Sequence, residues 1–224
     1  MTHASARRWL GAPWRLIHTL FSPHRRALLR FYRSGADERW LFPAGLTGDA
    51  VVIEVGGHVG EWVAKLRARS PCKVHVFEPV PEFHRRLVER FKEDPRIHLH
   101  AVGLGARDRV ATLGVAGDAS SLYQAGDAIE IRLVDGAAFL ASLGVARIDL
   151  MNVNCEGGEY ELLPRLIEAG WLARVTRLQI QFHRLGPDYR SAADAIRAAI
   201  DRTHERTFHF PFVWEGWRLR APQP

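Results

Sequence analysis

The chain of 224 residues is long enough for one sizeable core and too short for two comfortable domains, and its 47% apolar content suits a globular protein. Its formal net charge is +6, but seven arginines and no acid precede Asp37, so the rest of the chain is close to neutral. Because a duplex-binding protein usually carries a basic face on the folded domain itself, we predict no nucleic-acid partner.

The first 48 residues form a basic arm in which apolar residues and arginines are mixed. Residues 5–33 are interrupted by Pro13 and by Ser22-Pro23, a pattern that predicts two short amphipathic helices. Such an arm either packs its apolar stripe on its own domain or lies on a membrane surface or an acidic partner. Neither a membrane-spanning apolar run nor a signal-peptide pattern is present, which predicts a cytoplasmic protein, at most peripheral to the inner face of the membrane.

From residue 50 onward, short β-branched runs alternate with helical patterns. The predicted strands span 50–55, 73–77, 97–102, 148–153 and 175–182, and the predicted helices span 59–69, 81–92, 159–169 and 192–203. This alternation predicts an α/β fold with a doubly wound, mostly parallel sheet covered by helices on both faces. In the tail, residues 207–214 and 217–220 flank Glu215-Gly216, which predicts a C-terminal antiparallel hairpin at the sheet edge.

Glycines and an acidic residue follow the first two predicted strands. The first strand leads into a loop from Gly56 to Gly60, and the second ends at Glu78, whose carboxylate is suited to accept hydrogen bonds from two ribose hydroxyls. A dinucleotide fingerprint, GxGxxG, ending on Gly60 would need glycine at position 55, where Val55 stands. We therefore favour S-adenosylmethionine (SAM) as the cofactor, with an NAD-linked oxidoreductase or epimerase as the alternative.

Five runs of the sequence resemble the FkbM family of SAM-dependent methyltransferases, namely VVIEVGGHVGEW (51–62), VFEPVPEF (76–83), IDLMNVNCEGGEYELL (148–163), IQFH (180–183) and FVWEGW (212–217). The resemblance covers about residues 48–220 and is closest to a bacterial branch often found near genes of polysaccharide biosynthesis. It implies a class I methyltransferase (Rossmann-like) domain over residues 49–224. The implied reaction is O-methylation of a hydroxyl on a glycan, a glycolipid or a secondary metabolite.

The same resemblance implies which residues contact the cofactor. Those assigned to the methionine part of SAM are Glu54, Gly56, Gly57, His58 and Gly60. Glu78, followed by Pro79, would hold the ribose, and Val102 and Gly103, ending the third strand, would border the adenine. The family commonly has a lysine and an aspartate in the fourth strand, where this chain has Asn152 and Asn154. These two differences support the remaining alternative, a non-catalytic SAM-fold module.

A hydroxyl acceptor needs a group that receives its proton. His183 is the first candidate, because it follows the strand 175–182 and because histidine titrates near neutrality. The neighbouring strand delivers Asn154 and Glu156 to the same edge, and Glu156 is the second candidate for the base. A purely structural His183 is the alternative. Of the acids, only Glu156 and Glu159 are close in sequence, so we expect no metal ion. Ser121, in a glycine-rich loop over 114–126, is a further candidate at the cofactor.

Overall fold

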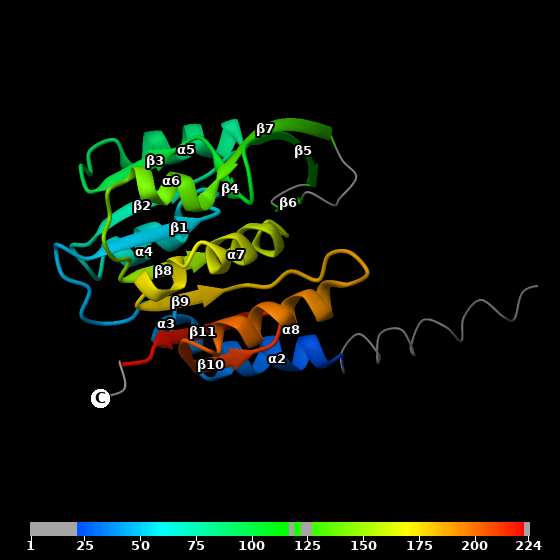
Figure 1. Ribbon diagram of the computed structural model, residues 1–224. Helices are drawn as coiled ribbons and strands as arrows, with labels where there is room; N and C mark the ends of the chain where they lie inside the picture. The colour runs from blue at the N-terminus through cyan, green and yellow to red at the C-terminus, as the bar shows by residue number, and fades with distance from the viewer. Residues whose placement is uncertain (1–21, 117–118, 122–126, 222–224) are drawn as a thin grey trace, which may run out of the picture.

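The computed structural model describes residues 22–116, 119–121 and 127–221, and its centre is a seven-stranded sheet (Figure 1). The strands follow the order β10-β11-β9-β8-β1-β2-β3. The strands β3, β2, β1, β8 and β9 run parallel, whereas β11 is antiparallel to both of its neighbours. The predicted doubly wound sheet with a C-terminal antiparallel hairpin is therefore confirmed. The bounds are β1 (Val51–Val55), β2 (Lys73–Phe77), β3 (Ile97–His100), β8 (Leu150–Val153), β9 (Arg177–Ile180), β10 (His204–Phe210) and β11 (Trp214–Leu219).

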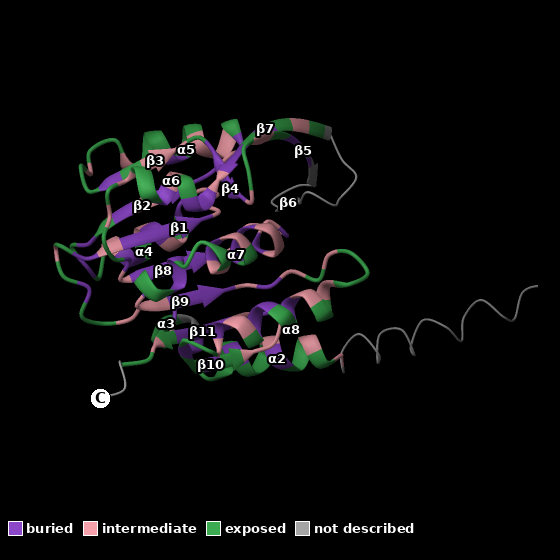
Figure 2. Ribbon diagram, viewed as in Figure 1, coloured by how far each residue is buried: buried purple, intermediate pink, exposed green. Residues whose placement is uncertain are grey.

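Helices cover both faces of this sheet, as the alternation of the sequence predicts. On one face, α4 (Glu61–Arg67) and α5 (Pro81–Phe91) bury Val63, Leu66 and Leu87 against β1, β2 and β8. The elements on the other face are α6 (Gly136–Ser142), α7 (Glu159–Glu168), the 3-10 helix η1 (Trp171–Arg174) and α8 (Tyr189–Ile200). Buried residues accordingly concentrate in the sheet and on the inner sides of the helices (Figure 2).

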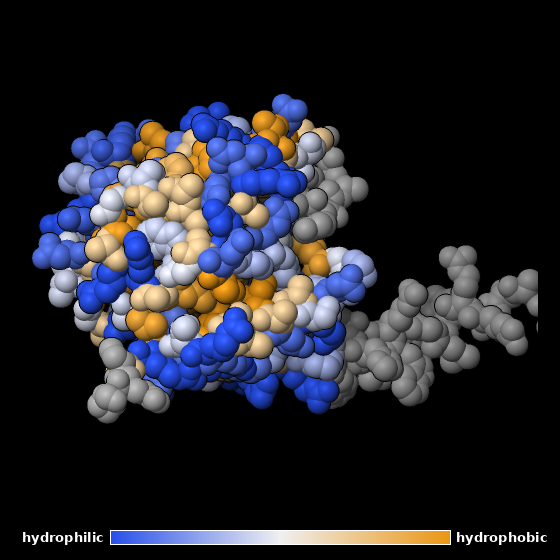
Figure 3. Space-filling view, in the orientation of Figure 1, coloured by the Kyte–Doolittle hydropathy of each residue, from blue (hydrophilic) through white to orange (hydrophobic). Residues whose placement is uncertain are grey.

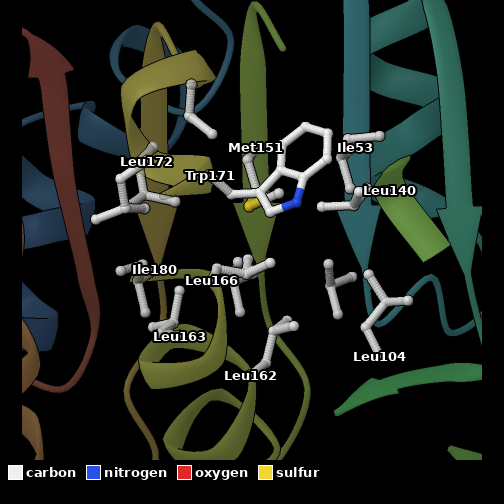
Figure 4. Packing of buried hydrophobic residues seen from close by; sticks show 14 of the residues in the cluster. Ile53, Leu104, Leu140, Met151, Leu162, Leu163, Leu166, Trp171, Leu172 and Ile180 are labelled. Atoms are coloured by element: carbon white, nitrogen blue, oxygen red, sulfur yellow. The ribbon is translucent and has the colours of Figure 1, made fainter. Parts of the chain in front are cut away.

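The larger core lies between α7 and the sheet. Leu162, Leu163 and Leu166 of α7 are fully buried and point toward Met151 and Ile180 of the sheet (Figure 4). Replacing one such leucine by alanine costs roughly 2–5 kcal/mol of stability. This packing fixes the start of α7, where Glu159 lies, against the ends of β8 and β9.

The basic arm contributes two described helices, α2 (Pro23–Arg33) and α3 (Ala36–Arg39). Residues 1–21, with the first of the two predicted helices, lie outside the described residues. In α2, Ala27 and Phe31 are buried, and Phe31 meets Phe210 of β10 edge to face at 5.3 Å between ring centroids. The apolar stripe of α2 thus packs on its own domain. None of the helices in the described ranges is long and apolar enough to cross a membrane.

The part of the chain between β3 and β8 forms a second, smaller sheet, which the sequence analysis does not predict. It contains β4 (Gly103–Gly105), β5 (Arg109–Ala116), β6 (Ala119–Ser121) and β7 (Asp127–Asp135), in the order β4-β7-β5-β6. The predicted third strand ends at His100 rather than at residue 102, so Gly103 begins a strand of the second sheet. The predicted loop over 114–126 is wrong where it overlaps β5 and β6. Alternating exposed and buried residues in β7 are the pattern that identifies this sheet.

The predicted turn of the C-terminal hairpin is also wrong. Glu215 and Gly216 lie inside β11, and the turn falls at residues 211–213, where Phe212 has a φ of 57°. Gly216 is required by packing, because a Cβ there would lie 2.1 Å from a ring carbon of Phe208. Glu215 is fully buried and pairs with Arg197 of α8 through contacts of 2.7 and 2.9 Å. A glycine beside a charged residue is typical of turns, which explains the error.

Candidate functional site

The loop after β1 joins the carboxyl ends of three neighbouring strands. The N–H of Gly56 donates to the carbonyl of Phe77 at 2.9 Å, which ties the loop to β2. Gly56 has a φ of +94°, and a Cβ there would lie only 1.8 Å from the carbonyl oxygen of Asn154, after β8. Only glycine permits this backbone conformation and this approach. The ends of β1, β2 and β8 are thereby brought together at one edge of the sheet.

Glu78 is anchored at this edge by two backbone groups. Its Oε2 accepts a hydrogen bond from the N–H of His58 at 2.7 Å, and its Oε1 accepts one from the N–H of Val80 at 2.9 Å. Burial raises the pKa of Glu78, and the two hydrogen bonds partly oppose that rise. His58 has a φ of 46°, an uncommon conformation for a residue with a side chain. The carboxylate therefore holds a strained loop in place and keeps further lone pairs for a ligand.

A pocket opens between the ends of these strands and the second sheet. The predicted residues that line it are Gly56, His58, Glu78, Pro79, Gly103, Asn154 and Glu156. Of the other predicted residues, Glu54, Gly57, Gly60, Val102 and His183 do not line it. Gly57 and Gly60 serve packing instead, because a Cβ at Gly57 would overlap Val76 of β2 and a Cβ at Gly60 would overlap Leu87 of α5. Ser121 pairs through its backbone with β5, and its side chain lies outside what the structure describes.

One wall of the pocket is apolar and comes largely from the second sheet, which the sequence prediction missed. Val80 and Phe83, at the start of α5, form one hydrophobic cluster with Leu113, Ile131 and Leu133 of β5 and β7. The His58 ring meets Phe83 edge to face, with 4.3 Å between centroids. Since flat, apolar rings bind favourably against such surfaces, this wall suits an adenine base.

The opposite end of the pocket is polar. Glu156 has a φ of 48°, so two of the three non-glycine residues with a positive φ in the described ranges, His58 and Glu156, line this pocket. Strained backbone of this kind concentrates at functional sites. The Oδ1 atom of Asn154 is buried and has no hydrogen-bond partner among the described residues. A buried acceptor without a partner costs free energy, and a bound donor would recover it.

Next to Glu156, buried side chains surround His183. Glu159 is fully buried; its Oε1 accepts the backbone N–H of His183 at 2.7 Å and lies 3.1 Å from the ring Nδ1. Its Oε2 accepts the N–H of Gly157 at 2.8 Å. The ring Nε2 of His183 lies 3.2 Å from Oε1 of Glu156, and the carbonyl of His183 accepts a hydrogen bond from the Tyr160 hydroxyl at 2.6 Å. The imidazole thus lies between two carboxylates.

These carboxylates set the charge of His183. Burial alone lowers the pKa of His183, but the close contacts and negative charges of Glu156 and Glu159 outweigh it and raise the pKa to about 9. The imidazole is therefore protonated at neutral pH, whereas the sequence predicts a histidine that titrates near neutrality. Glu159, which the sequence places in the first turn of a helix, is the residue that orients His183.

Glu54 lies beneath the pocket rather than in it. It is 3% exposed, and its Oε2 accepts a hydrogen bond from the side-chain amide of Asn152 at 2.8 Å. Burial raises the pKa of Glu54 well above its ordinary value, and the bond from Asn152 opposes this only in part. The pair links β1 to β8 directly below the loop. In the part of the chain that the structure describes, no group of three or more His, Cys, Asp or Glu residues is placed to hold a metal ion.

Comparison with known proteins finds similarity to methyltransferases. A family model described as "Methyltransferase FkbM domain" matches residues 54–210. The AMB antimetabolite synthetase AmbE of Pseudomonas aeruginosa is 25% identical over 199 residues, which covers 68% of this chain and 9% of AmbE. The chain therefore spans less than a tenth of the length of that curated relative.

Two solved structures are among those to which the chain is similar. The N-methyltransferase NodS from Bradyrhizobium japonicum shows a TM-score of 0.49 and 13% identity, covering 91% of this chain and 99% of NodS. An rRNA methylase from Streptococcus thermophilus also shows a TM-score of 0.49, with 12% identity, covering 79% of this chain and 90% of the methylase.

Proposed function

Because the chain belongs to the FkbM methyltransferase family and uses SAM as methyl donor, we propose that it is an O-methyltransferase acting on a hydroxyl of a glycan, glycolipid or secondary metabolite. The observation that supports this most strongly is the position of Glu156. It lines the cofactor pocket and is backed by a protonated histidine, so a carboxylate is available where an acceptor hydroxyl would meet the methyl group.

The pocket suits SAM at both of its ends. Glu78 would accept the ribose hydroxyls, and the wall of Val80, Phe83 and Leu133 would cover the adenine. The buried Oδ1 of Asn154 would accept a hydrogen bond from the amino group of the methionine part. When bound, SAM supplies an electrophilic methyl group, so the protein itself needs no nucleophile.

The remaining task of the protein is to orient the acceptor and to receive its proton. Positioning two reactants in one site accounts for up to roughly 7–11 kcal/mol of a barrier, and a base adds about 10²–10⁴ in rate. In this proposal Glu156 accepts a hydrogen bond from the acceptor hydroxyl and receives its proton. His183 lies outside the pocket lining, so it is a positioning residue that holds Glu156 through their 3.2 Å contact. Glu159 fixes His183 from the opposite side.

The test is the rate of S-adenosylhomocysteine formation with a panel of methyl glycosides and glycolipids. Glu156→Gln should bind SAM as wild type does but transfer methyl at least a hundredfold more slowly, roughly the loss of a base. Glu168→Gln, on the exposed last turn of α7, is the matched control.

The pH profile separates the two candidate bases. If Glu156 receives the proton, the rate should stay level across neutral pH and fall above about pH 9, where His183 loses the charge that holds Glu156. A rate that instead rises through pH 9 would identify His183 as the base. Transfer only to amino groups, tested with amino sugars in parallel, would refute O-methylation.

A further inference from the structure

Helix α2 presents a strongly basic outer face. Its inner face, with Ala27 and Phe31, is buried against the domain, whereas four arginines are exposed on the outside, namely Arg25, Arg26, Arg30 and Arg33. Two large apolar side chains are exposed on the same helix: Leu29 is 54% exposed and Tyr32 is 60% exposed. The helix contains no acidic residue. The lower edge of the space-filling view, where α2 lies in Figure 1, is mainly hydrophilic (Figure 3).

Among the side chains that the structure describes, which do not include that of Asp37, no carboxylate forms an ion pair with any of these four arginines. Helix α5 shows the contrast: it has the same length and also begins with proline, but its first-turn Glu82 pairs with Arg85 and Arg86. In α2, Arg25 and Arg26 occupy the first turn, where the helix dipole disfavours positive charge. An anionic partner at the start of α2 would offset this unfavourable charge, whereas Arg30 and Arg33 lie in the last turn, where the dipole favours them.

The start of α2 lies on the side of the molecule where the carboxyl ends of the parallel strands are found (Figure 1). Burial, and then the charge of Arg184 in the loop that follows β9, lower the pKa of His24 at the start of α2. Arg184 directly follows His183 in the chain and is itself exposed. In Figure 1, α2 begins on the side of the molecule toward which the parallel strands point. A partner bound along α2 therefore borders the side of the sheet where the pocket opens.

We propose that the outer face of α2 docks the protein on an anionic lipid bilayer. Arginine guanidinium groups bind phosphate and carboxylate groups of lipids through paired hydrogen bonds, and each basic residue near such a surface strengthens binding. Leu29 and Tyr32 enter the boundary between headgroups and acyl chains, as apolar and aromatic residues of interfacial helices do. These two residues favour a bilayer over a nucleic acid, which offers no apolar surface along its phosphates.

The experiment is co-sedimentation of the full chain with vesicles of phosphatidylcholine and phosphatidylserine, compared with vesicles of phosphatidylcholine alone. The test variant combines Arg26→Glu, Arg30→Glu and Arg33→Glu. The control combines Arg107→Glu, Arg132→Glu and Arg202→Glu, which changes net charge equally at exposed arginines of other elements. Wild type and control should bind the anionic vesicles, and the test variant should bind at least about a hundredfold more weakly, at roughly fivefold per arginine.

A second variant, Leu29→Ala with Tyr32→Ala, tests insertion at unchanged charge and should weaken binding about tenfold. Circular dichroism verifies that each variant is folded. The proposal is overturned if wild type does not bind anionic vesicles, or if the test variant and the control bind them equally tightly. Two results together would also overturn it: the Leu29→Ala, Tyr32→Ala variant binds vesicles as tightly as wild type, and wild type binds duplex RNA as tightly as it binds vesicles. Vesicle binding needs no methyl transfer, so its outcome is independent of the proposed function.

Discussion

Replacing Glu78 by glutamine tests the cofactor assignment with the smallest change of shape. The carboxylate of Glu78 holds the N–H groups of His58 and Val80, at 2.7 and 2.9 Å, and in the proposed complex it also accepts the ribose hydroxyls. An amide keeps one acceptor oxygen, so one of the two N–H groups loses its partner. The bonds that remain also lose the negative charge of their acceptor.

These contacts set the expected loss of SAM affinity and of stability in the Glu78→Gln variant. A hydrogen bond to a charged group contributes about 1.5–3 kcal/mol, and a factor of ten in affinity corresponds to about 1.4 kcal/mol, so SAM should bind at least about tenfold more weakly. One buried N–H without a partner costs roughly 1–3 kcal/mol, which lowers the Tm by several degrees in a protein of this size. Both effects should appear together, because the same carboxylate holds the loop and the ligand.

The assay is isothermal calorimetry of SAM binding at a temperature well below the Tm, with thermal unfolding measured in parallel. Glu93→Gln is the control, since Glu93 is exposed on the surface after α5. A folded Glu78→Gln protein that binds SAM as tightly as wild type would refute the reasoning, because Glu78 would then hold only the loop.

Two further predictions concern buried titratable groups. Glu54→Gln keeps an acceptor oxygen for the side-chain amide of Asn152 and should change the free energy of unfolding by less than about 1 kcal/mol; urea unfolding that shows a loss of several kcal/mol would demonstrate a required charge. Burial, and then the charges of His98 and His100, lower the pKa of His75 to about 4, so the unfolded chain binds more protons between pH 6.5 and 4. The free energy of unfolding should therefore decline as the pH falls through that window, and the decline should be smaller in the His75→Val variant. Urea unfolding at several pH values measures this; an equal dependence of the free energy of unfolding on pH in both proteins would contradict the prediction.

The ends of β1 and β2 could be predicted from the sequence because their signals are local. Glycines after a buried strand predict the loop, and an acid directly after the next strand predicts the place of Glu78, although contacts with Phe77, His58 and Asn154 hold both in position. The same holds for Asn154 and Glu156, which follow β8 directly. Where a residue's place at the pocket depends on its immediate chain neighbours, a single sequence is sufficient to predict that place.

Features that depend on distant contacts could not be predicted in this way. The chain does not show that Glu159 is fully buried against His183, because that contact requires α7 to pack across the ends of β8 and β9. The bond between Asn152 and Glu54 joins residues 98 positions apart. The apolar wall depends on the second sheet, and glycines near residue 114 obscured its strands. In each case tertiary packing determines the role of the residue.

The most direct test is a crystal structure of the full chain in complex with S-adenosylhomocysteine. The ribose hydroxyls should lie within hydrogen-bonding distance of the Glu78 carboxylate, the adenine should lie against Phe83 and Leu133, and the sulfur should face Asn154 and Glu156. A ligand bound with its adenine toward Glu156, or bound away from Glu78 altogether, would contradict the assignment of this pocket.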